Sequence, residues 1–137
     1  GELVVQGQKP NRTPWKIEIE QPNDDASFGS SSQIRVELAS GQAMATSGDY
    51  RNYRVVDGKR ISHTIDPRSG RPIEHNLASV SILAQDCTTA DALATAVMVL
   101  GPEKGMELIE SLSGVACLLI LRVEEGFEKK PSSNWPS

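Results

Sequence analysis

The chain has 137 residues, with 14 Lys and Arg against 18 Asp and Glu, and its formal net charge is −4. This length fits a single domain. Because binding along a nucleic acid needs a basic stripe, an acidic chain without a Lys/Arg run argues against that class of function.

The N-terminal third shows the two-residue periodicity of half-buried strands. Apolar and polar side chains alternate most clearly through residues 15–20, and residues 3–6 and 34–38 have a similar character. Residues 7–14 and 21–32 are rich in Pro, Asn, Asp, Gly and Ser, which predicts connecting loops. These patterns favour antiparallel β structure.

A β-hairpin is predicted over residues 53–63. The pair Asp57-Gly58 separates two strand-like runs, and Asp-Gly tolerates the positive φ angles of a tight two-residue turn. Residues 66–72 follow with two prolines and a glycine, which predicts a constrained loop. His63 is therefore expected at a strand end beside a loop.

Two adjacent helices are predicted in the second half of the chain. Residues 88–100 have helical composition, with Asp86 or Thr88 as the N-terminal cap and Gly101 as the stop. Pro102 suits the first turn of a second helix through about Leu112.

Strands are predicted on either side of these helices, at residues 78–84 and 115–123, and residues 124–137 are expected to be a frayed tail. The fold class is therefore α+β, a mostly antiparallel sheet with two adjacent helices.

Asp91 and Thr95 are the candidate metal ligands. Spaced four apart on the predicted helix, their Cβ atoms would lie about 5 to 6 Å from each other on one face. Carboxylate and hydroxyl oxygens suit Mg²⁺. The alternative is structural, because an Asp early in a helix favours the helix dipole and a nearby Thr commonly bonds to the backbone.

His63 is the candidate acid, base or phosphate ligand, with Ser62, Thr64 and Asp66 as polar neighbours. The alternative is a partly buried histidine bonded to a backbone carbonyl. His75 lies in a polar stretch, where a solvated side chain is expected.

The segment 46–50, Thr-Ser-Gly-Asp-Tyr, could bring backbone N–H groups close to a phosphate or ribose. The same residues also fit an ordinary turn. Cys87 and Cys117 lack the spacing of a zinc site, and the sequence leaves a disulfide open.

Three blocks in this order and spacing give the chain a resemblance to a known family. They are residues 46–53 (TSGDYRNY), 63–72 (HTIDPRSGRP) and 90–95 (ADALAT), and the chain is similar to the ApbE family of FAD:protein FMN transferases from its first residues to about Val123. The resemblance implies a T-fold-like architecture of which residues 1–137 would form the C-terminal half, as one domain or half-domain.

The resemblance also implies an activity, Mg²⁺-dependent transfer of FMN from FAD to a threonine of a flavoprotein, with release of AMP. It implies that His63 is catalytic, that Asp91 and Thr95 bind magnesium, and that the flavin site is bounded by a further set of residues. These are Ser47, Gly48, Asp49, Thr64, Ile65 and Asp66. The alternatives are an FAD pyrophosphatase, which uses water as acceptor, and a flavin-binding module without turnover.

Partners and location are likewise implied by the resemblance. The acceptor would be a subunit of a quinone reductase or an Rnf-type complex, and the full-length protein would be lipid-anchored on the periplasmic side of the inner membrane. The sequence has neither a starting Met nor a signal pattern. We therefore expect a longer protein, and we expect this portion alone to be inactive.

Overall fold

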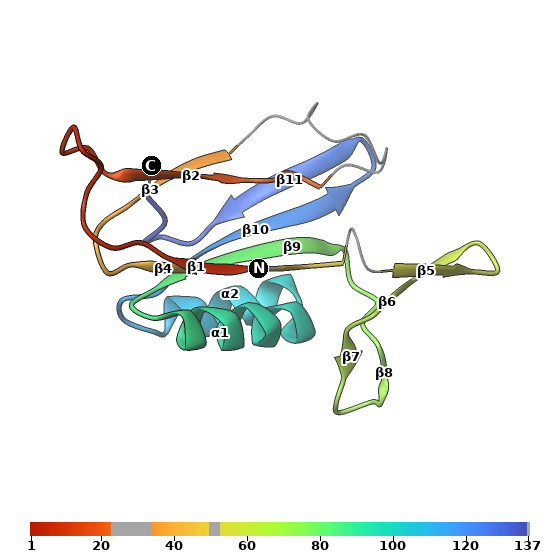
Figure 1. The fold of residues 1–137 in the computed structure, drawn as a ribbon. Helices are drawn as coiled ribbons and strands as arrows, with labels where there is room; N and C mark the ends of the chain where they lie inside the picture. Colours follow the sequence, from red (N-terminus) through yellow and green to blue (C-terminus); the bar gives the residue numbers. More distant parts are fainter. Residues whose placement is uncertain (23–33, 50–52, 137) are drawn as a thin grey trace.

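A computed structural model describes residues 1–22, 34–49 and 53–136. The elements form three layers, with helices α1 (Cys87–Leu100) and α2 (Pro102–Glu110) on one side of a five-stranded sheet and a two-stranded hairpin on the other (Figure 1). This arrangement confirms the α+β prediction of a mostly antiparallel sheet with two adjacent helices.

The central sheet is antiparallel throughout, with strand order β1-β4-β9-β10-β11. Its strands are β1 (Glu2–Val4), β4 (Ala43–Gly48), β9 (Leu77–Ala84), β10 (Ala116–Val123) and β11 (Gly126–Pro131). All eight residues of β9 are buried, because both faces of this middle strand are covered.

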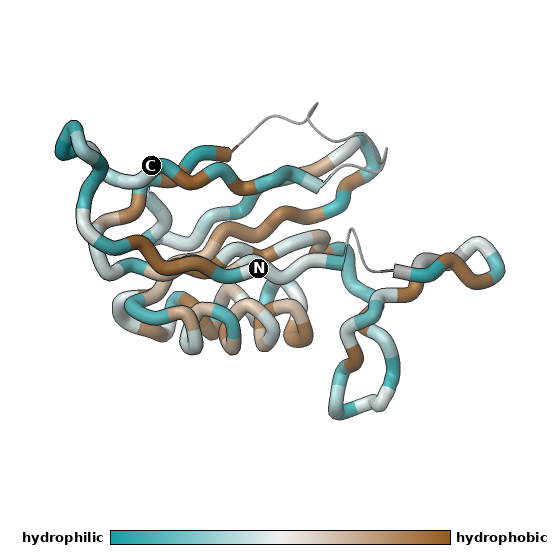
Figure 2. Tube along the Cα trace, in the orientation of Figure 1, coloured by the Kyte–Doolittle hydropathy of each residue, from teal (hydrophilic) through white to brown (hydrophobic). Residues whose placement is uncertain are grey.

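The two faces of the sheet are packed by different layers. Val80, Ile82 and Leu119 belong to the core on the helical side, whereas Leu83 and Leu118 pack under the hairpin of β2 (Trp15–Ile19) and β3 (Ile34–Leu38). Figure 2 shows hydrophobic segments along the central strands, between the two covering layers. The alternation of side chains along each strand therefore supplies both cores.

A β-bulge interrupts the pairing of β9 with β10. Ile120 pairs with Ser79 but Leu121 pairs with Leu77, so Ala78 is the extra residue. The bulge lets Leu77 face the helices together with Val80 and Ile82, although its position along β9 has the opposite parity.

Two small hairpins project from one end of the body (Figure 1). The first joins β5 (Tyr53–Val56) to β6 (Lys59–Ser62), as predicted, with φ of 50° at Asp57 and 75° at Gly58 in the turn. The second joins β7 (Ile65–Asp66) to β8 (Arg71–Pro72), where the sequence predicted only a loop.

The ends of α1 follow from local sequence. Asp86 is the N-terminal cap, and its two carboxylate oxygens accept hydrogen bonds from the backbone N–H and the hydroxyl of Thr89 at 2.7 and 2.8 Å. Gly101 ends the helix with φ of 84°, a conformation that favours glycine, and Pro102 begins α2. The predicted stop at Gly101 and the predicted start of the second helix at Pro102 are confirmed, and Asp86 is the cap of the two candidates.

Replacing Asp86 by Ala is expected to lower the thermal midpoint at neutral pH. The hydrogen bonds from Thr89 hold the pKa of Asp86 below its ordinary value in the folded protein. The cap is thus fully stabilising above the ordinary pKa of Asp, about 4, and this contribution is lost as the pH falls through the lowered folded pKa. Thermal melts of both proteins across this range should therefore converge at acidic pH. An Asp86→Asn variant, which keeps a capping oxygen, is the control.

The expectation of a frayed tail from residue 124 is wrong. Strand β11 pairs with β10 from Val123 opposite Gly126 to Leu118 opposite Pro131. The strand lacks a hydrophobic alternation because it is a sheet edge, where Lys129, Lys130 and Pro131 are exposed. Charged residues and proline are typical of edge strands, which need no second apolar face.

Other differences are local. Residues 46–48, considered as part of a turn, are the end of β4, whereas Tyr50 and most of the expected loop 21–32 lie outside the described residues. Cys87 and Cys117 are free thiols. Among the described residues, neither helix has the length and apolar character needed to cross a membrane.

Candidate functional site

A pocket of about 470 Å³ lies where α1, the end of β4 and the β6–β7 connection meet. Several segments that are far apart in the chain contribute to its wall. The lining residues are Gly1, Glu20, Thr46, Ser47, Gly48, His63, Thr64, Asp91, Thr95 and Met98. Six of the nine predicted site residues are therefore brought together in one cavity.

The end of β4 forms a wall of small residues. The Thr46 hydroxyl lies 2.8 Å from that of Ser81 on β9, and the Thr46 carbonyl accepts a hydrogen bond from the Gly1 nitrogen at 3.0 Å. Ser47 and Gly48 complete this wall. Because these side chains are short, a ligand can approach the strand backbone closely.

Asp91 and Thr95 lie on α1 and are both exposed. With Met98 they present one face of the helix to the pocket, as their spacing of four and three residues predicts. The Asp86 cap holds the first turn of this helix, directly before Asp91.

His63 and Thr64 follow directly after β6. His63 is exposed, and Thr64 is held by a hydrogen bond from its backbone N–H to the Ser62 hydroxyl at 3.1 Å. The Thr64 carbonyl accepts from the backbone N–H of Ile73 at 3.1 Å. This connection therefore has a defined path, and His63 and Thr64 line the pocket together with residues of α1.

The predicted residues Asp49, Ile65 and Asp66 do not line the pocket. Asp49 is buried and forms an ion pair with Arg122, with 2.5 Å between Oδ1 and the guanidinium nitrogen. Ile65 is about half exposed, at 49%. Asp66 accepts two hydrogen bonds from the Arg68 guanidinium, at 2.9 and 2.8 Å, which lower the pKa of the Asp66 carboxyl.

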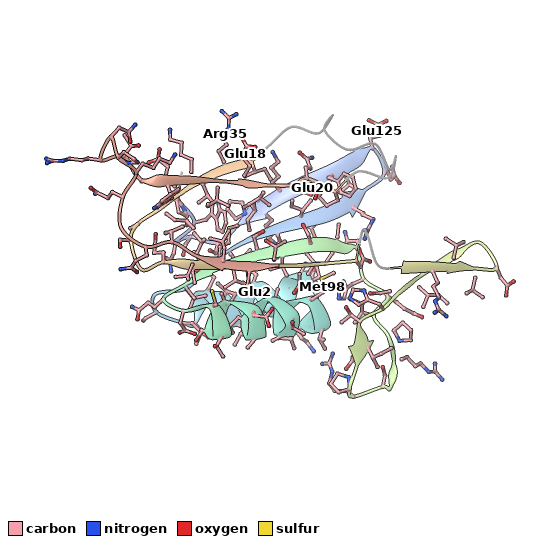
Figure 3. All side chains as sticks on the ribbon, viewed as in Figure 1. Glu2, Glu18, Glu20, Arg35, Met98 and Glu125 are labelled. Atoms are coloured by element: carbon pink, nitrogen blue, oxygen red, sulfur yellow. The ribbon has the colours of Figure 1, made fainter. Side chains whose placement is uncertain are left out.

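Glu20 is a lining residue that sequence reasoning missed. It follows β2 on the other side of the sheet from α1, and Figure 3 shows it at the same end of the body as Met98. Its place in the alternating run 15–20 predicts that it lies on the polar face of the strand, but not that this face contributes to a pocket. Gly1 and Met98 also line the pocket without having been predicted, and Thr46 was considered only as the first residue of the segment 46–50.

The charges around the pocket are mostly negative. Its lining includes two carboxylates, Glu20 and Asp91, and among the described residues that form it none is Lys or Arg. The described residues contain no cluster of three or more His, Cys, Asp or Glu side chains placed to hold a metal ion. The oxygen donors present are those that Mg²⁺ prefers when it keeps several waters and shares its shell with substrate phosphates.

His75 is not solvated as the sequence suggested. Its Nε2 lies 2.8 Å from the Met98 carbonyl, and its Nδ1 accepts a hydrogen bond from the Leu77 backbone N–H at 3.3 Å. Nδ1 is therefore the acceptor and Nε2–H the donor. The ring also packs against Gly101, where an added Cβ would lie 3.1 Å from the imidazole. His75 thus ties the last turn of α1 to the start of β9.

Replacing His75 by Ala is expected to lower the free energy of unfolding by about 1 to 3 kcal/mol, since both partners lose their hydrogen bond. Urea titration followed by circular dichroism measures this change. His63→Ala is the matched control, and because His63 is exposed its effect should stay within about 0.5 kcal/mol. Equal effects of the two substitutions would contradict the structural role of His75.

Comparisons with known proteins identify the family of the chain and agree with its fold. The model of the ApbE family matches residues 1–119. The chain is 43% identical to an FAD:protein FMN transferase of Vibrio cholerae over 135 residues, which covers 98% of this chain and 39% of the relative. It is 41% identical to that of Escherichia coli K12 over 137 residues, 100% of this chain and 38% of the relative.

The solved structures include a similar fold. The Pseudomonas stutzeri flavinyl transferase ApbE in its apo form superposes with a TM-score of 0.80 at 47% identity, over 97% of this chain and 39% of that one. The chain thus spans about two fifths of the length of the relatives it matches. Both the family model and the structural agreement extend over most of its residues, and the chain belongs to the ApbE family.

Proposed function

We propose that the protein carrying this chain transfers FMN from FAD to a threonine of an acceptor flavoprotein, in a reaction that requires Mg²⁺ and releases AMP. The observation that carries the proposal is the convergence of His63, Asp91 and the Ser47–Gly48 wall on one pocket. The names of the relatives, FAD:protein FMN transferase, support the same activity.

The charge of the pocket supports the proposed requirement for a cation. A pyrophosphate carries several negative charges, and two carboxylates with no Lys or Arg among the described lining residues would repel it. Asp91 and Thr95 are the residues that would hold Mg²⁺. When bound there, the cation would supply neutralisation of the phosphate oxygens.

The remaining chemistry belongs to the side chains of this chain. The acceptor threonine oxygen attacks the phosphorus of the FMN half, the bond from that phosphorus to the AMP oxygen breaks, and the hydroxyl proton passes to Nδ1 or Nε2 of His63. The proton is then available for the departing AMP. Imidazole suits this exchange because it gains and loses a proton near neutral pH.

Water is the competing acceptor. Glu20, His63, Asp91 and Thr95 are all exposed in this structure, so water reaches the same pocket. Hydrolysis of FAD to FMN and AMP is therefore the second candidate function. The acceptor protein would have to exclude water from the pocket for transfer to dominate.

The full-length protein, incubated with FAD, Mg²⁺ and an acceptor subunit, separates these functions by product. AMP with protein-bound FMN is expected. AMP with free FMN would identify a pyrophosphatase, and unchanged FAD would identify a flavin-binding module without turnover. Chelation by EDTA should stop the reaction, and an acceptor whose target threonine is replaced by valine should remain unmodified.

The acceptor and the location are part of the same proposal. A subunit of a quinone reductase or an Rnf-type complex fits a reaction that attaches a redox cofactor covalently. A lipid-anchored protein on the periplasmic side of the inner membrane would meet such complexes. Cell fractionation with antibodies to the full-length protein tests the location, and recovery in the cytoplasmic fraction would refute it.

A further inference from the structure

The ion pair between Asp49 and Arg122 joins two strands that are not neighbours. Asp49 follows the end of β4, Arg122 lies near the end of β10, and β9 runs between these strands. The side chains are 7% and 21% exposed, respectively, and their contact is 2.5 Å. A largely desolvated contact of this kind crosses the middle strand and links both of its neighbours.

Backbone hydrogen bonds around the β9 bulge complete the link. The Asp49 N–H donates to the carbonyl of Ala78, the bulged residue, at 3.1 Å. The Arg122 N–H donates to the Asn76 carbonyl at 2.8 Å, and the Asn76 amide donates back to the Arg122 carbonyl at 3.0 Å. The register shift falls between Ile120 and Leu121, so the bulge lies beside Arg122 and its ion pair with Asp49.

This link ends directly beside the pocket. Ser47 and Gly48 line the cavity, whereas neither Asp49 nor Arg122 does. Glycine has no side chain to pack and the widest backbone freedom of any residue. Fixing Asp49, the next residue, therefore restricts the backbone of the Ser47–Gly48 wall.

Stability alone is a weak reason for such a pair. The cost of desolvating two charges commonly offsets their attraction, and apolar residues of similar volume often stabilise a protein as well or better. An ion pair that links β4 to β10 across β9 does, however, fix the positions of these strand ends relative to each other.

We propose that Asp49 and Arg122 are positioning residues that hold the Ser47–Gly48 wall in the shape that binds FAD. The proposal rests on the proposed function. It adds Arg122 to the site, a residue beyond the segment 1–119 that the family model matches, and it changes the expected role of Asp49 from contacting flavin to holding the wall that does.

Three variants of the full-length protein test the proposal. Arg122→Met removes the charge and keeps much of the apolar stem, Arg122→Lys keeps the charge, and Asp49→Asn with Arg122→Met removes the charge of both partners. The dissociation constant for FAD is measured by equilibrium titration. Hydrogen exchange, measured by mass spectrometry, compares the amides of residues 47–49 with those of Val80 and Ile82 in β9.

The expected result for Arg122→Met is an FAD dissociation constant about 10 to 100 times higher, by analogy with the loss of affinity when a residue that orients a metal ligand is replaced. Faster exchange should be confined to residues 47–49. Arg122→Lys should recover part of the affinity. The double variant should regain thermal stability, because no uncompensated buried charge remains, but should still bind FAD weakly.

Arg35→Met is the matched control. Arg35 on β3 forms an ion pair with Glu18 at 2.9 Å, both side chains are exposed, and Figure 3 shows the pair on the outer layer of the molecule. This variant should bind FAD like the wild type.

Unchanged FAD affinity in a folded Arg122→Met protein would overturn the proposal. So would faster exchange throughout the sheet, or a double variant whose affinity recovers together with its stability, since each indicates a purely structural role. If the wild type binds no FAD, the proposed function fails, and the affinity claim fails with it. The exchange comparison then still shows whether the pair holds the wall.

Discussion

Replacement of Asp91 by Ala in the full-length protein is expected to lower Mg²⁺-dependent FMN transfer by at least about a hundredfold, because loss even of residues that only orient a metal ligand costs about 10- to 100-fold. Asp91 is exposed on α1 and lines the pocket. The substitution removes a charge without removing core volume. Transfer rates measured across a magnesium titration should show a raised requirement for the cation.

Two further variants show whether the loss of transfer is specific to Asp91. Glu107→Ala removes an exposed carboxylate from α2, outside the pocket lining, and should transfer FMN at the wild-type rate. Thr95→Ala should be milder than Asp91→Ala, since a neutral hydroxyl contributes less to holding a cation. The assignment of Asp91 as ligand is untenable if Asp91→Ala and the wild type show the same magnesium dependence and the same maximum rate.

Replacement of His63 by Ala is expected to slow the transfer step by about 10² to 10⁴, the usual contribution of a general acid or base. FAD affinity should change only a few-fold, because a group that moves the proton stabilises mainly the transition state. Single-turnover rates measured beside equilibrium FAD titrations separate these effects. His63→Gln, which keeps a hydrogen-bonding side chain but cannot exchange the proton, should be nearly as slow.

The opposite pattern would assign His63 a different role. Weakened FAD binding with an unchanged single-turnover rate would make it a binding residue. Circular dichroism should show that both variants are folded, as expected for a residue that is exposed at the end of β6.

Elements whose signals are local could be predicted from the sequence. The Asp86 cap, the Gly101 stop and the Asp57-Gly58 turn each act within a few residues, so the helices and the β5–β6 hairpin were identified. Asp91 and Thr95 share one helix face for the same reason. By contrast, the prediction that α1, His63 and the end of β4 share one site rested on the family resemblance and not on residue spacing.

What the sequence could not supply depends on distant contacts. Glu20 looks like an ordinary exposed residue of an alternating strand, and only the packing of β2 over the sheet places it at the pocket. Asp49 looks like a turn residue until Arg122, 73 positions away, is seen to pair with it. Strand β11 depends on pairing with β10 and carries no apolar face of its own.

The assembly of the pocket from separate segments also affects how the protein folds. Its wall includes Gly1, Glu20, residues 46–48, residues 63–64 and α1, so no early local structure such as a single hairpin can contain it. Contacts between residues far apart in sequence form late, after the entropy cost of closing long loops. A ligand of this pocket consequently recognises only the finished domain. At a free concentration of a hundred times its dissociation constant, the ligand would add about 2.7 kcal/mol to the free energy of unfolding. The nascent chain would gain none of this stabilisation until folding is complete.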